Sequence, residues 1–311
     1  MADVSDWAVF ARTAELKSLS AAGRDLRLSA AVVSNRIAKL EKRLGVRLLN
    51  RTTRRVNLTE EGQQFYEHCT KILHEIELIE STIGSGSNRP RGAITVTAPA
   101  GFGRRHVAPF MPAFTERHPD VQVRLHLSDR LTDVIQEGTD VAIRIADIKA
   151  YSFIMKKLAS NTRVIVGAPD YLEKHGEPRE PDDLLNHNCL LLRFPGSQQF
   201  QWTLEGPGGA ATVPVAGNLD SDDGEAILEW ARGGAGLALK SMWEVGDDIR
   251  EGRLRAVLPE WAPIGHAIYA IYPHSRLMPT RVRAFIDFLA GIYGPRPYWE
   301  TGAARPDRSI S

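Results

Sequence analysis

The clearest chemical pattern in this sequence is formed by the cationic, amide and hydroxyl groups of residues 29–45, SAAVVSNRIAKLEKRLG. Apolar residues recur there at helical spacing and predict a buried stripe of Val33, Ile37, Leu40 and Leu44. The polar residues off that stripe are Ser29, Ser34, Asn35, Arg36 and Lys39. Asn and Arg on a helix in a DNA major groove can contact adenine and guanine bidentately. The alternative is an ordinary solvated face.

A second set of candidates follows predicted strands later in the chain, where loops at strand ends commonly line ligand clefts. Residues 99–102 (Pro99, Ala100, Gly101, Phe102) precede a predicted helix, whose first backbone N–H groups are suited to holding an anion. The other candidates for the same cleft are Ser128, Arg144, Arg193 and Phe194. For each candidate the alternative is structural, because a glycine after a strand often makes a turn and an arginine often pairs with an acid.

Asp222 and Glu225 fit a helix cap, with Asp222 capping a helix from Asp223. Because their carboxylates would repel an anionic ligand, we expect them to have a structural role.

Nothing in the sequence favours catalysis. It contains no HExxH, GxSxG, P-loop or complete GxGxxG motif. The histidines show no metal-ligand spacing, and the two cysteines, Cys69 and Cys189, lack a CxxC arrangement. The sequence therefore predicts neither an enzyme nor a metal or cofactor site.

Charge is distributed unevenly along the 311 residues. Residues 1–60 contain 12 Lys and Arg against 6 acids, a net charge of +6, so the remainder carries about −5 of the total of +1. A small cationic part joined to a mildly acidic one suggests that the first part meets a polyanion. The start of the chain does not resemble an export signal and no long apolar run follows, so we expect a cytoplasmic protein without membrane contact.

The elements that would position the first set of side chains can be read from residues 5–60. Apolar spacing from Trp7 predicts a first helix ending near Lys17, and Ser20 would cap a second helix over 21–26. A short turn leads to the third helix, which starts at Ser29 and stops at Gly45, as in a helix-turn-helix. The alternating residues that follow predict a hairpin, a basic wing that carries Arg51 and Arg54.

A long helix is predicted from Thr59 onward. Its apolar positions recur at spacings of three and four: Phe65, Cys69, Ile72, Ile76, Ile79 and Ile83. Such a seam is typical of a coiled coil, so we infer a homodimer. Gly, Ser and Asn between 84 and 92 then indicate a hinge.

Beyond the hinge, strand and helix patterns alternate. Strands are predicted at 93–98, 121–127, 140–145, 162–168, 235–240 and 266–272, and helices at 107–116, 131–136, 225–232 and 281–293. This alternation predicts parallel sheets covered on both faces, arranged as two lobes with a cleft between them. The Pro- and Arg-rich segment 295–311 is expected to be a flexible tail.

These motifs together resemble a known family. SLSAAGRDLRLSAAVVSNRIAKLEKRLGVRLLNRTTRRVNLTEEG is similar to the amino-terminal signature of LysR-type transcriptional regulators, and RGAITVTAPAGFGRRHVAPFMPAFTERHPDVQVRLHLSDR is similar to the start of their effector domain. The resemblance covers about residues 5–293. More narrowly, HLSDRLTDVIQEGTDVAIRIAD and PDYLEKHGEPREPDDL resemble a branch that includes regulators of dicarboxylate catabolism. The family often has Gln-Pro where this chain has Ala30-Ala31, so one amide that could contact bases is missing.

The resemblance implies an α/β protein of three parts: an all-α winged helix-turn-helix domain (1–60), a dimerising linker helix and hinge (61–91), and a two-lobed effector domain like a periplasmic binding protein (92–294). Lobe I is expected at about 92–163 and 267–294, and lobe II at 164–266. The implied partners are double-stranded promoter DNA, a small organic acid, further copies of the chain as a dimer or tetramer, and RNA polymerase. Two alternatives stay open: a solute-binding module, and an architectural DNA binder without an effector.

Overall fold

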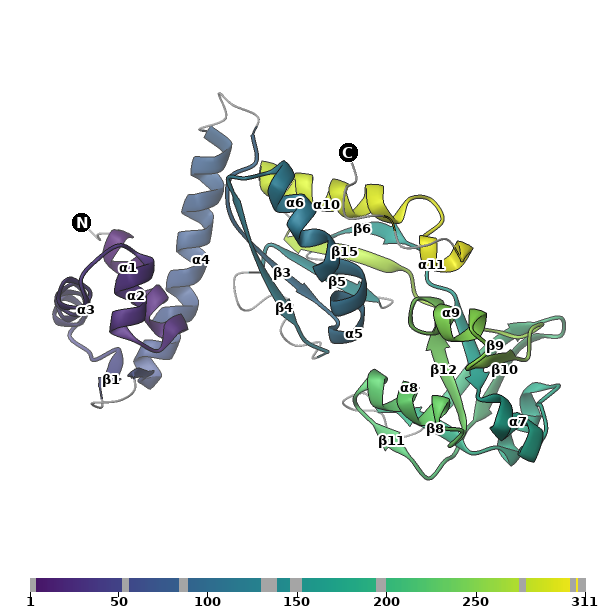
Figure 1. Cartoon of the computed structure of the whole chain (residues 1–311). Coiled ribbons are helices and arrows are strands. Elements are labelled where there is room, and N and C mark those ends of the chain that lie inside the picture. Colours follow the sequence, from purple (N-terminus) through teal and green to yellow (C-terminus); the bar gives the residue numbers. More distant parts are fainter. Residues whose placement is uncertain are drawn as a thin grey trace. The chain divides into compact units, whose positions relative to one another are not determined.

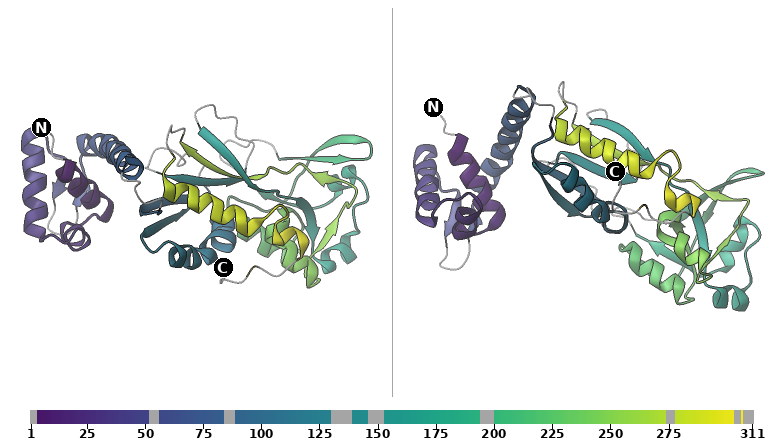
Figure 2. Two further views of the ribbon diagram at one scale, coloured as in Figure 1. Left: turned by 90° about the horizontal axis from the view of Figure 1, so that it is seen from above. Right: turned by 45° about the horizontal axis from the view of Figure 1, so that its top comes forward.

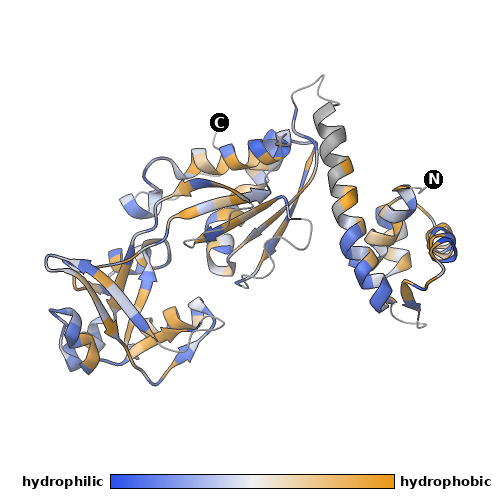
Figure 3. Ribbon diagram, turned by 180° about the vertical axis from the view of Figure 1, so that it is seen from behind, coloured by the Kyte–Doolittle hydropathy of each residue, from blue (hydrophilic) through white to orange (hydrophobic). Residues whose placement is uncertain are grey.

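The computed structural model describes residues 4–51, 56–83, 89–129, 139–145, 153–193, 200–273, 278–302 and 306 (Figure 1). They form two compact units, one built mostly from residues 4–91 and the other mostly from the residues after Gly92. In Figure 3 apolar residues recur along many strands of the second unit, whereas helix α3 (Ala30–Leu44) of the first unit carries both polar and apolar residues around its axis.

The head of the first unit consists of helices α1 (Val4–Leu16), α2 (Leu19–Asp25) and α3 (Ala30–Leu44). Val33, Ile37 and Leu40 of α3 are fully buried, as predicted, but Leu44 in its last turn is 40% exposed. The helix boundaries are those expected from the sequence. Ser29 Oγ accepts a hydrogen bond from Val32 N at 3.3 Å, and Gly45 ends the helix with a φ of 73°, a conformation that glycine adopts without steric cost.

Helix α2 begins earlier than predicted. Its N-cap is Ser18, whose Oγ accepts a hydrogen bond from Ala21 N at 3.2 Å, whereas Ser20 is exposed within the first turn. A Cβ on buried Gly23 would lie 2.7 Å from the carbonyl oxygen of Leu28, so glycine is needed where the turn closes against α2. Serine is a common N-cap, so residue type alone did not distinguish Ser18 from Ser20.

We expect Ser18→Ala to lower the free energy of unfolding of the head by about 1 kcal/mol, because Ala21 N–H loses its acceptor. Hydrogen exchange of the amides in α2 should then become about fivefold faster. Ser20→Ala is the matched control and should leave exchange unchanged. Equal acceleration in both variants would show that Ser18 is not the cap.

The wing is a two-stranded hairpin of β1 (Leu49–Arg51) and β2 (Val56–Leu58), paired antiparallel. Glu41 of α3 supports it, because its Oε1 accepts hydrogen bonds from the backbone N–H groups of Leu48 at 2.9 Å and Leu49 at 3.1 Å. The tip of the hairpin, including Arg54, lies outside the described residues. Glu41 thereby links the helix with the DNA-contact candidates to the basic hairpin.

Helix α4 (Glu60–Ile83) follows Thr59, whose Oγ1 accepts a hydrogen bond from Gly62 N at 2.9 Å. The predicted seam is only partly right. Phe65 packs edge-on against Phe10 with 5.3 Å between ring centroids, and Cys69 is 1% exposed with its Sγ donating to Trp7 O. These two residues therefore close the core of the head. The next seam position, Ile72, is 43% exposed.

The second unit contains two five-stranded sheets. The first has the strand order β4-β3-β5-β15-β6, formed by β3 (Gly92–Ala98), β4 (Val121–Leu127), β5 (Val141–Ile145), β6 (Phe153–Ala159) and β15 (Ile268–Pro273). Between β3 and β4 runs a helical segment of α5 (Ala100–Phe102), the π-helix η1 (Gly103–Val107), the 3-10 helix η2 (Ala108–Phe110) and α6 (Met111–Arg117). Helix α10 (Thr280–Tyr293) lies along this sheet (Figure 2), and Asp287 pairs with Lys156 of β6 at 2.6 Å.

The second sheet has the order β11-β8-β12-β7-β13, formed by β7 (Arg163–Gly167), β8 (Cys189–Leu192), β11 (Asp220–Ser221), β12 (Leu237–Ser241) and β13 (Arg255–Val257). A smaller sheet joins β9 (Gln201–Gly206), β10 (Gly209–Pro214) and β14 (Ala262–Pro263). The accompanying helices are α7 (Pro169–His175), the 3-10 helix η4 (Pro181–Asn186), α8 (Gly224–Arg232) and α9 (Met242–Arg250). We call the first sheet with its helices lobe I, and the other two sheets with theirs lobe II.

Two predictions for this unit were wrong. The sheets are mixed: β15 pairs antiparallel with β5 and β6, and β7 pairs antiparallel with β12 and β13. The segment after Pro295 is not all a tail, because Tyr298–Thr301 forms helix α11, in which Tyr298 is 9% and Trp299 5% exposed. Two adjacent aromatic residues bury enough apolar surface to hold a short helix in place.

Candidate functional site

The polar face predicted for α3 is present on the head. Ser29, Asn35 and Lys39 are exposed, and Ser34 is partly buried. Their helix turns its opposite side, Val33, Ile37 and Leu40, into the core. The buried stripe therefore fixes which side of α3 is presented to solvent, and this side holds the expected amide and cation.

Arg36 is also on α3, but its guanidinium is partly held by helix α1. Its Nη1 donates a hydrogen bond to Ser5 Oγ at 2.9 Å and lies 3.9 Å from Asp6 Oδ1. The Arg36 side chain is still 36% exposed. These contacts pre-position the guanidinium at the edge of the exposed face, and a DNA contact would have to share it with Ser5.

Not every cation of the head is available to a polyanion. Arg12 of α1 forms a bidentate pair with Asp25 of α2, with distances of 2.6 and 2.8 Å, and a further bond to Glu15 at 2.6 Å. The hydrogen bond that Arg12 donates to Asp25 is the largest cause of the raised pKa of Arg12. This arginine fastens α1 to α2.

The backbone of Arg51 ends strand β1, where the basic hairpin begins.

The segment predicted to hold an anion lies at the start of the helical segment in lobe I. Pro99 precedes α5, and Ala100 N donates a hydrogen bond to Asp129 Oδ1 at 2.9 Å. One of the N–H groups expected to bind an external anion is thus satisfied by a carboxylate of the same lobe. An ideal Cβ on Gly101 would lie 3.3 Å from Glu225 Oε1, so the start of this segment faces lobe II.

The ring of Phe102 is part of the protein core. It is fully buried and packs edge-on against Trp243, Tyr293 and Trp299, with centroid distances of 5.3, 6.0 and 5.8 Å. Such a ring has no surface left for a ligand in this conformation. Phe102 was expected among the ligand contacts, and the structure instead gives it a packing role.

The remaining predicted contacts are dispersed. Ser128 N donates to Ala98 O at 3.0 Å, which closes the end of β4 against β3. Arg144 is 3% exposed on β5, and its Nη1 donates to Ile143 O at 2.7 Å. Arg193 is 57% exposed and pairs with Asp220 of the neighbouring strand, the structural alternative considered for it. Phe194 lies outside the described residues.

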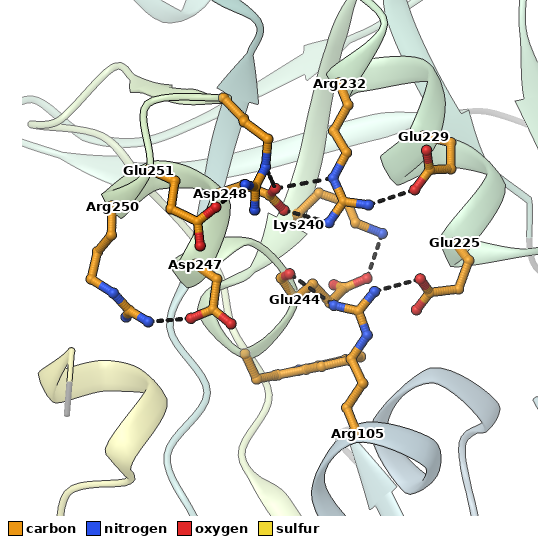
Figure 4. Close-up of polar contacts among 12 residues, drawn as sticks. Arg105, Glu225, Glu229, Arg232, Lys240, Glu244, Asp247, Asp248, Arg250 and Glu251 are labelled. Carbon is orange, nitrogen blue, oxygen red and sulfur yellow. Dashed lines mark hydrogen bonds and ion pairs between the residues drawn. The ribbon is translucent and has the colours of Figure 1, made fainter. Parts of the chain in front are cut away.

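The structure reveals a polar contact between the lobes that the sequence did not indicate (Figure 4). Arg105 of η1 in lobe I pairs through Nη2 with the Glu225 carboxylate of α8 in lobe II, and its Nη1 donates to Glu244 O of α9 at 3.0 Å. The two charged side chains are 26% and 29% exposed. We call Gly101, Arg105, Glu225, Trp243 and Glu244 the interlobe junction.

Lobe II supports its side of the junction with further buried charge (Figure 4). Lys240 is 2% exposed, pairs with the Glu244 carboxylate and donates to Gly224 O at 2.8 Å, which anchors the start of α8. The helix cap also differs from expectation, because Asp223 and not Asp222 accepts the hydrogen bond from Glu225 N, at 2.7 Å. Glu225 is therefore free of the capping role assigned to it and reaches across to lobe I.

Within the part of the chain that the structure describes, no group of three His, Cys, Asp or Glu side chains is placed to hold a metal ion. None of the described helices has the length and apolar character needed to cross a membrane.

Two protein-family models match the chain. "Bacterial regulatory helix-turn-helix protein, lysR family" matches residues 4–63, and "LysR substrate binding domain" matches residues 87–292. Among similar proteins, the HTH-type transcriptional regulator DmlR of Escherichia coli (strain K12) is 35% identical over 286 residues, which cover 92% of this chain and 93% of that protein. The HTH-type transcriptional activator TtdR of the same strain is 36% identical over 273 residues, 88% of each protein.

Solved structures show the same likeness. The full-length Vibrio cholerae virulence activator AphB, a member of the LTTR protein family, superimposes with a TM-score of 0.61 and 27% identity, covering 93% of this chain and 99% of that one. CrgA, a LysR-type transcriptional regulator from Neisseria meningitidis, gives a TM-score of 0.60 and 29% identity, covering 94% of this chain and 100% of that one.

Proposed function

This chain belongs to the LysR family of bacterial transcription regulators, and from that premise we propose how its head meets DNA and what its second unit senses. Family membership confirms the expected architecture of a DNA-binding head and a two-lobed effector domain, and makes the chain a regulator rather than an enzyme. We propose that α3 enters the major groove with Ser29, Ser34, Asn35, Arg36 and Lys39 toward the bases and phosphates. The observation that carries this is the polar face of α3 opposite the fully buried residues Val33, Ile37 and Leu40.

We expect Arg36→Ala to weaken binding to a preferred DNA sequence by about 1–3 kcal/mol and to relax base preference, because a guanidinium that contacts a base edge discriminates between sequences. Lys42→Ala is the matched control in the last turn of α3. It should weaken binding to all duplexes alike and reduce the magnitude of the slope of log affinity against log salt by about 1. Fluorescence anisotropy, with a duplex selected from a randomised library and with its scrambled counterpart, measures both.

Ser5→Ala distinguishes the two roles open to Arg36. This variant removes the hydroxyl that Arg36 Nη1 bonds but keeps the guanidinium. If Arg36 contacts DNA, Ser5→Ala should retain the base preference of the parent protein. If Arg36 only fastens α3 to α1, Ser5→Ala and Arg36→Ala should lose the same affinity for both duplexes, which would refute the proposed contact.

We propose that the wing adds phosphate or minor-groove contacts through Arg51 and Arg54, and that α4 pairs two chains. The support for pairing is the exposure of Ile72 in a helix whose apolar positions continue at seam spacing beyond the head. Two heads joined in this way would meet two half-sites of promoter DNA. The family resemblance extends the proposal to a dimer of dimers, and sedimentation velocity of the full chain tests both states.

For the second unit we propose an organic acid as effector, bound at the interlobe junction. The support is that the junction already holds a carboxylate, Glu225, against the guanidinium of Arg105. A carboxylate of a small molecule offers the same two oxygens to this planar donor group. Of the residues predicted from the sequence, Gly101 remains in this proposal because it faces Glu225 and Trp243 from the lobe I side, whereas Arg144 and Arg193 would act on the ligand only in another arrangement.

Binding there would shift the population of lobe arrangements and, through it, the arrangement of the heads on DNA. Couplings of this kind typically amount to about 1–3 kcal/mol. Thermal unfolding of the full chain with succinate, malate, tartrate, acetate and a neutral diol tests the effector class. Stabilisation by the acids alone supports the proposal, and stabilisation by the diol alone would overturn it.

A further inference from the structure

Residues 297–302, which we call the clasp, bridge the two lobes of the second unit. The clasp comprises Pro297, helix α11 and Gly302, and it follows α10 of lobe I. Figure 1 shows α11 between the end of α10 and helix α9 of lobe II. Its two aromatic residues are almost fully buried. These residues, which the sequence predicts to be part of a flexible tail, are therefore held against the second unit by two buried aromatic side chains.

On the side of lobe I, the clasp holds a buried histidine. The hydroxyl group of Tyr298 lies 2.6 Å from Nδ1 of His106, which is 4% exposed in η1. The His106 ring is also packed edge-on against Trp299, with 4.8 Å between centroids. The other ring nitrogen, Nε2, lies 3.1 Å from Trp243 O in α9. His106 therefore touches the clasp with one nitrogen and lobe II with the other.

On the side of lobe II, the clasp contacts helix α9 and one of the chain crossings between the lobes. Glu300 Oε1 accepts a hydrogen bond from Thr162 N at 2.7 Å, and Thr162 lies where the chain passes from β6 of lobe I to β7 of lobe II. A Cβ on Gly246 of α9 would lie 3.5 Å from the carbonyl oxygen of Trp299, and one on Gly302 would lie 3.8 Å from Arg250 Cδ.

These contacts matter because the covalent connections between the lobes are short. The chain crosses at 160–162, between β6 and β7, and again at 264–267, between β14 and β15. Two such crossings form a hinge, and hinge rotation changes backbone angles at a few residues. Rotation of the lobes away from the present arrangement would have to break at least one of three hydrogen bonds. These join Tyr298 to His106, His106 to Trp243, and Thr162 to Glu300.

The clasped arrangement also carries a cost. Among the described residues, the indole N–H groups of Trp243 and Trp299 are buried without an acceptor. Unsatisfied buried donors are unfavourable, so an arrangement that gives these groups acceptors would compete with the clasped one. An element with two arrangements of similar free energy is what a ligand-driven switch needs.

We propose that the clasp is a positioning element that sets the equilibrium between lobe arrangements, with Tyr298 and Glu300 as its two polar fastenings. The proposal concerns the lobes themselves and holds whether or not the effector is an organic acid. Weakening the clasp should widen the range of lobe arrangements without unfolding either lobe.

The test is a distance measurement between spin labels on the full chain. Glu116→Cys in α6 and Glu173→Cys in α7 place one label on an exposed position of each lobe, and both native cysteines are buried. Labelled protein is diluted with unlabelled protein so that distances within one chain dominate. We expect the Tyr298→Phe, Glu300→Met double variant, which nearly preserves side-chain volume and removes both polar contacts, to give a broader or shifted distance distribution than the parent chain.

The matched control is Arg296→Ala, an exposed residue just before the clasp, which should leave the distribution unchanged. Hydrogen exchange of Thr162 N–H should accelerate about tenfold in Glu300→Met, which removes the acceptor oxygen, and not in the control. Because the double variant keeps both aromatic rings, loss of folding is not expected; a far-ultraviolet circular dichroism spectrum establishes this. A distribution identical to that of the parent chain, both in the double variant and in a chain ending at Pro295, would overturn the proposal.

Discussion

If Arg105 holds a small dicarboxylate effector, as we propose, replacing it with glutamine should weaken the binding of that ligand by about 10- to 100-fold. The estimate follows from the loss of charge-assisted hydrogen bonds worth about 1.5–3 kcal/mol. Arg105 reaches from lobe I to the acidic side of lobe II and is partly exposed, so that a ligand can reach its guanidinium. Isothermal titration calorimetry of the full chain with succinate, malate and tartrate measures the change.

The neighbouring Arg104 provides the control. It is exposed on the same helical turn and has the same charge, so Arg104→Gln alters long-range electrostatics without removing the contact to Glu225. We expect no more than a small loss of affinity in this variant. Equal losses at positions 104 and 105 would mean that only the net charge of the lobe matters, and would contradict a specific site at Arg105.

Glu225→Gln gives the opposite expectation. If the Glu225 carboxylate occupies the place of the ligand, removing its charge frees Arg105 and should strengthen dicarboxylate binding. The gain should be modest, about two- to fivefold, because ion pairs with this degree of exposure contribute at most about 1 kcal/mol. Weaker binding in Glu225→Gln would instead identify this carboxylate as a strut that holds the lobes together around the ligand.

The head could be predicted closely because the signals for it are local. The N-cap Ser29, the stripe at 33, 37 and 40, and Gly45 all lie within one helix and its ends, where the covalent chain fixes the geometry. Predictions were less accurate where the burial of a residue depends on its packing against distant parts of the chain. Cys69 has the spacing of a coiled-coil seam, yet it is buried against Trp7 of α1, a residue far away in sequence.

The same limit explains the sheets of the second unit. Alternating strands and helices favour parallel pairing, but β15 follows all of lobe II and then returns to lobe I between β5 and β6. No local feature of residues 268–273 encodes that return. The clasp was missed for a related reason. Tyr298 and Trp299 are held in place by contacts with His106 and Phe102, which are distant in sequence.

The contact of Arg105 with lobe II was not predicted, because the direction of its side chain depends on the local helix type. It stands in a run of two arginines and a histidine, and a regular α-helix would not by itself decide which arginine faces lobe II. The structure shows a π-helix at Gly103–Val107, where each turn contains an additional residue and the directions of the following side chains are rotated. Sequence periodicity at 3.6 residues cannot represent this shift. Gly101, in contrast, could be placed near the lobe II side from the sequence because it lies close to the end of a well-predicted strand, and its contact with an effector remains a prediction.

A second large effect is expected at Asp248, which is fully buried in α9. Figure 4 shows it beside Arg232, whose Nη2 lies 2.6 Å from Asp248 Oδ2. A second guanidinium, that of Arg253, lies with its Nε 2.6 Å from Asp248 Oδ1. Asp248→Asn should lower the free energy of unfolding of the second unit by about 3 kcal/mol, because two guanidinium groups lose their shared buried counter-charge. Asp247→Asn is the control: that carboxylate is 75% exposed beside Arg250, so its removal should change stability very little.

The same pair of variants predicts a pH dependence with a definite sign. Burial alone would raise the pKa of Asp248, but the hydrogen bonds from Arg232 and Arg253 outweigh burial and lower it. A carboxyl group with a lowered pKa in the folded state stabilises the protein above its unfolded pKa of about 4, and this contribution is lost as the pH falls through the folded pKa. Urea unfolding between pH 7 and pH 3 should therefore show the parent and Asp248→Asn chains converging in stability toward acid. A constant difference across this range would mean that Asp248 stabilises the fold through its shape and not its charge.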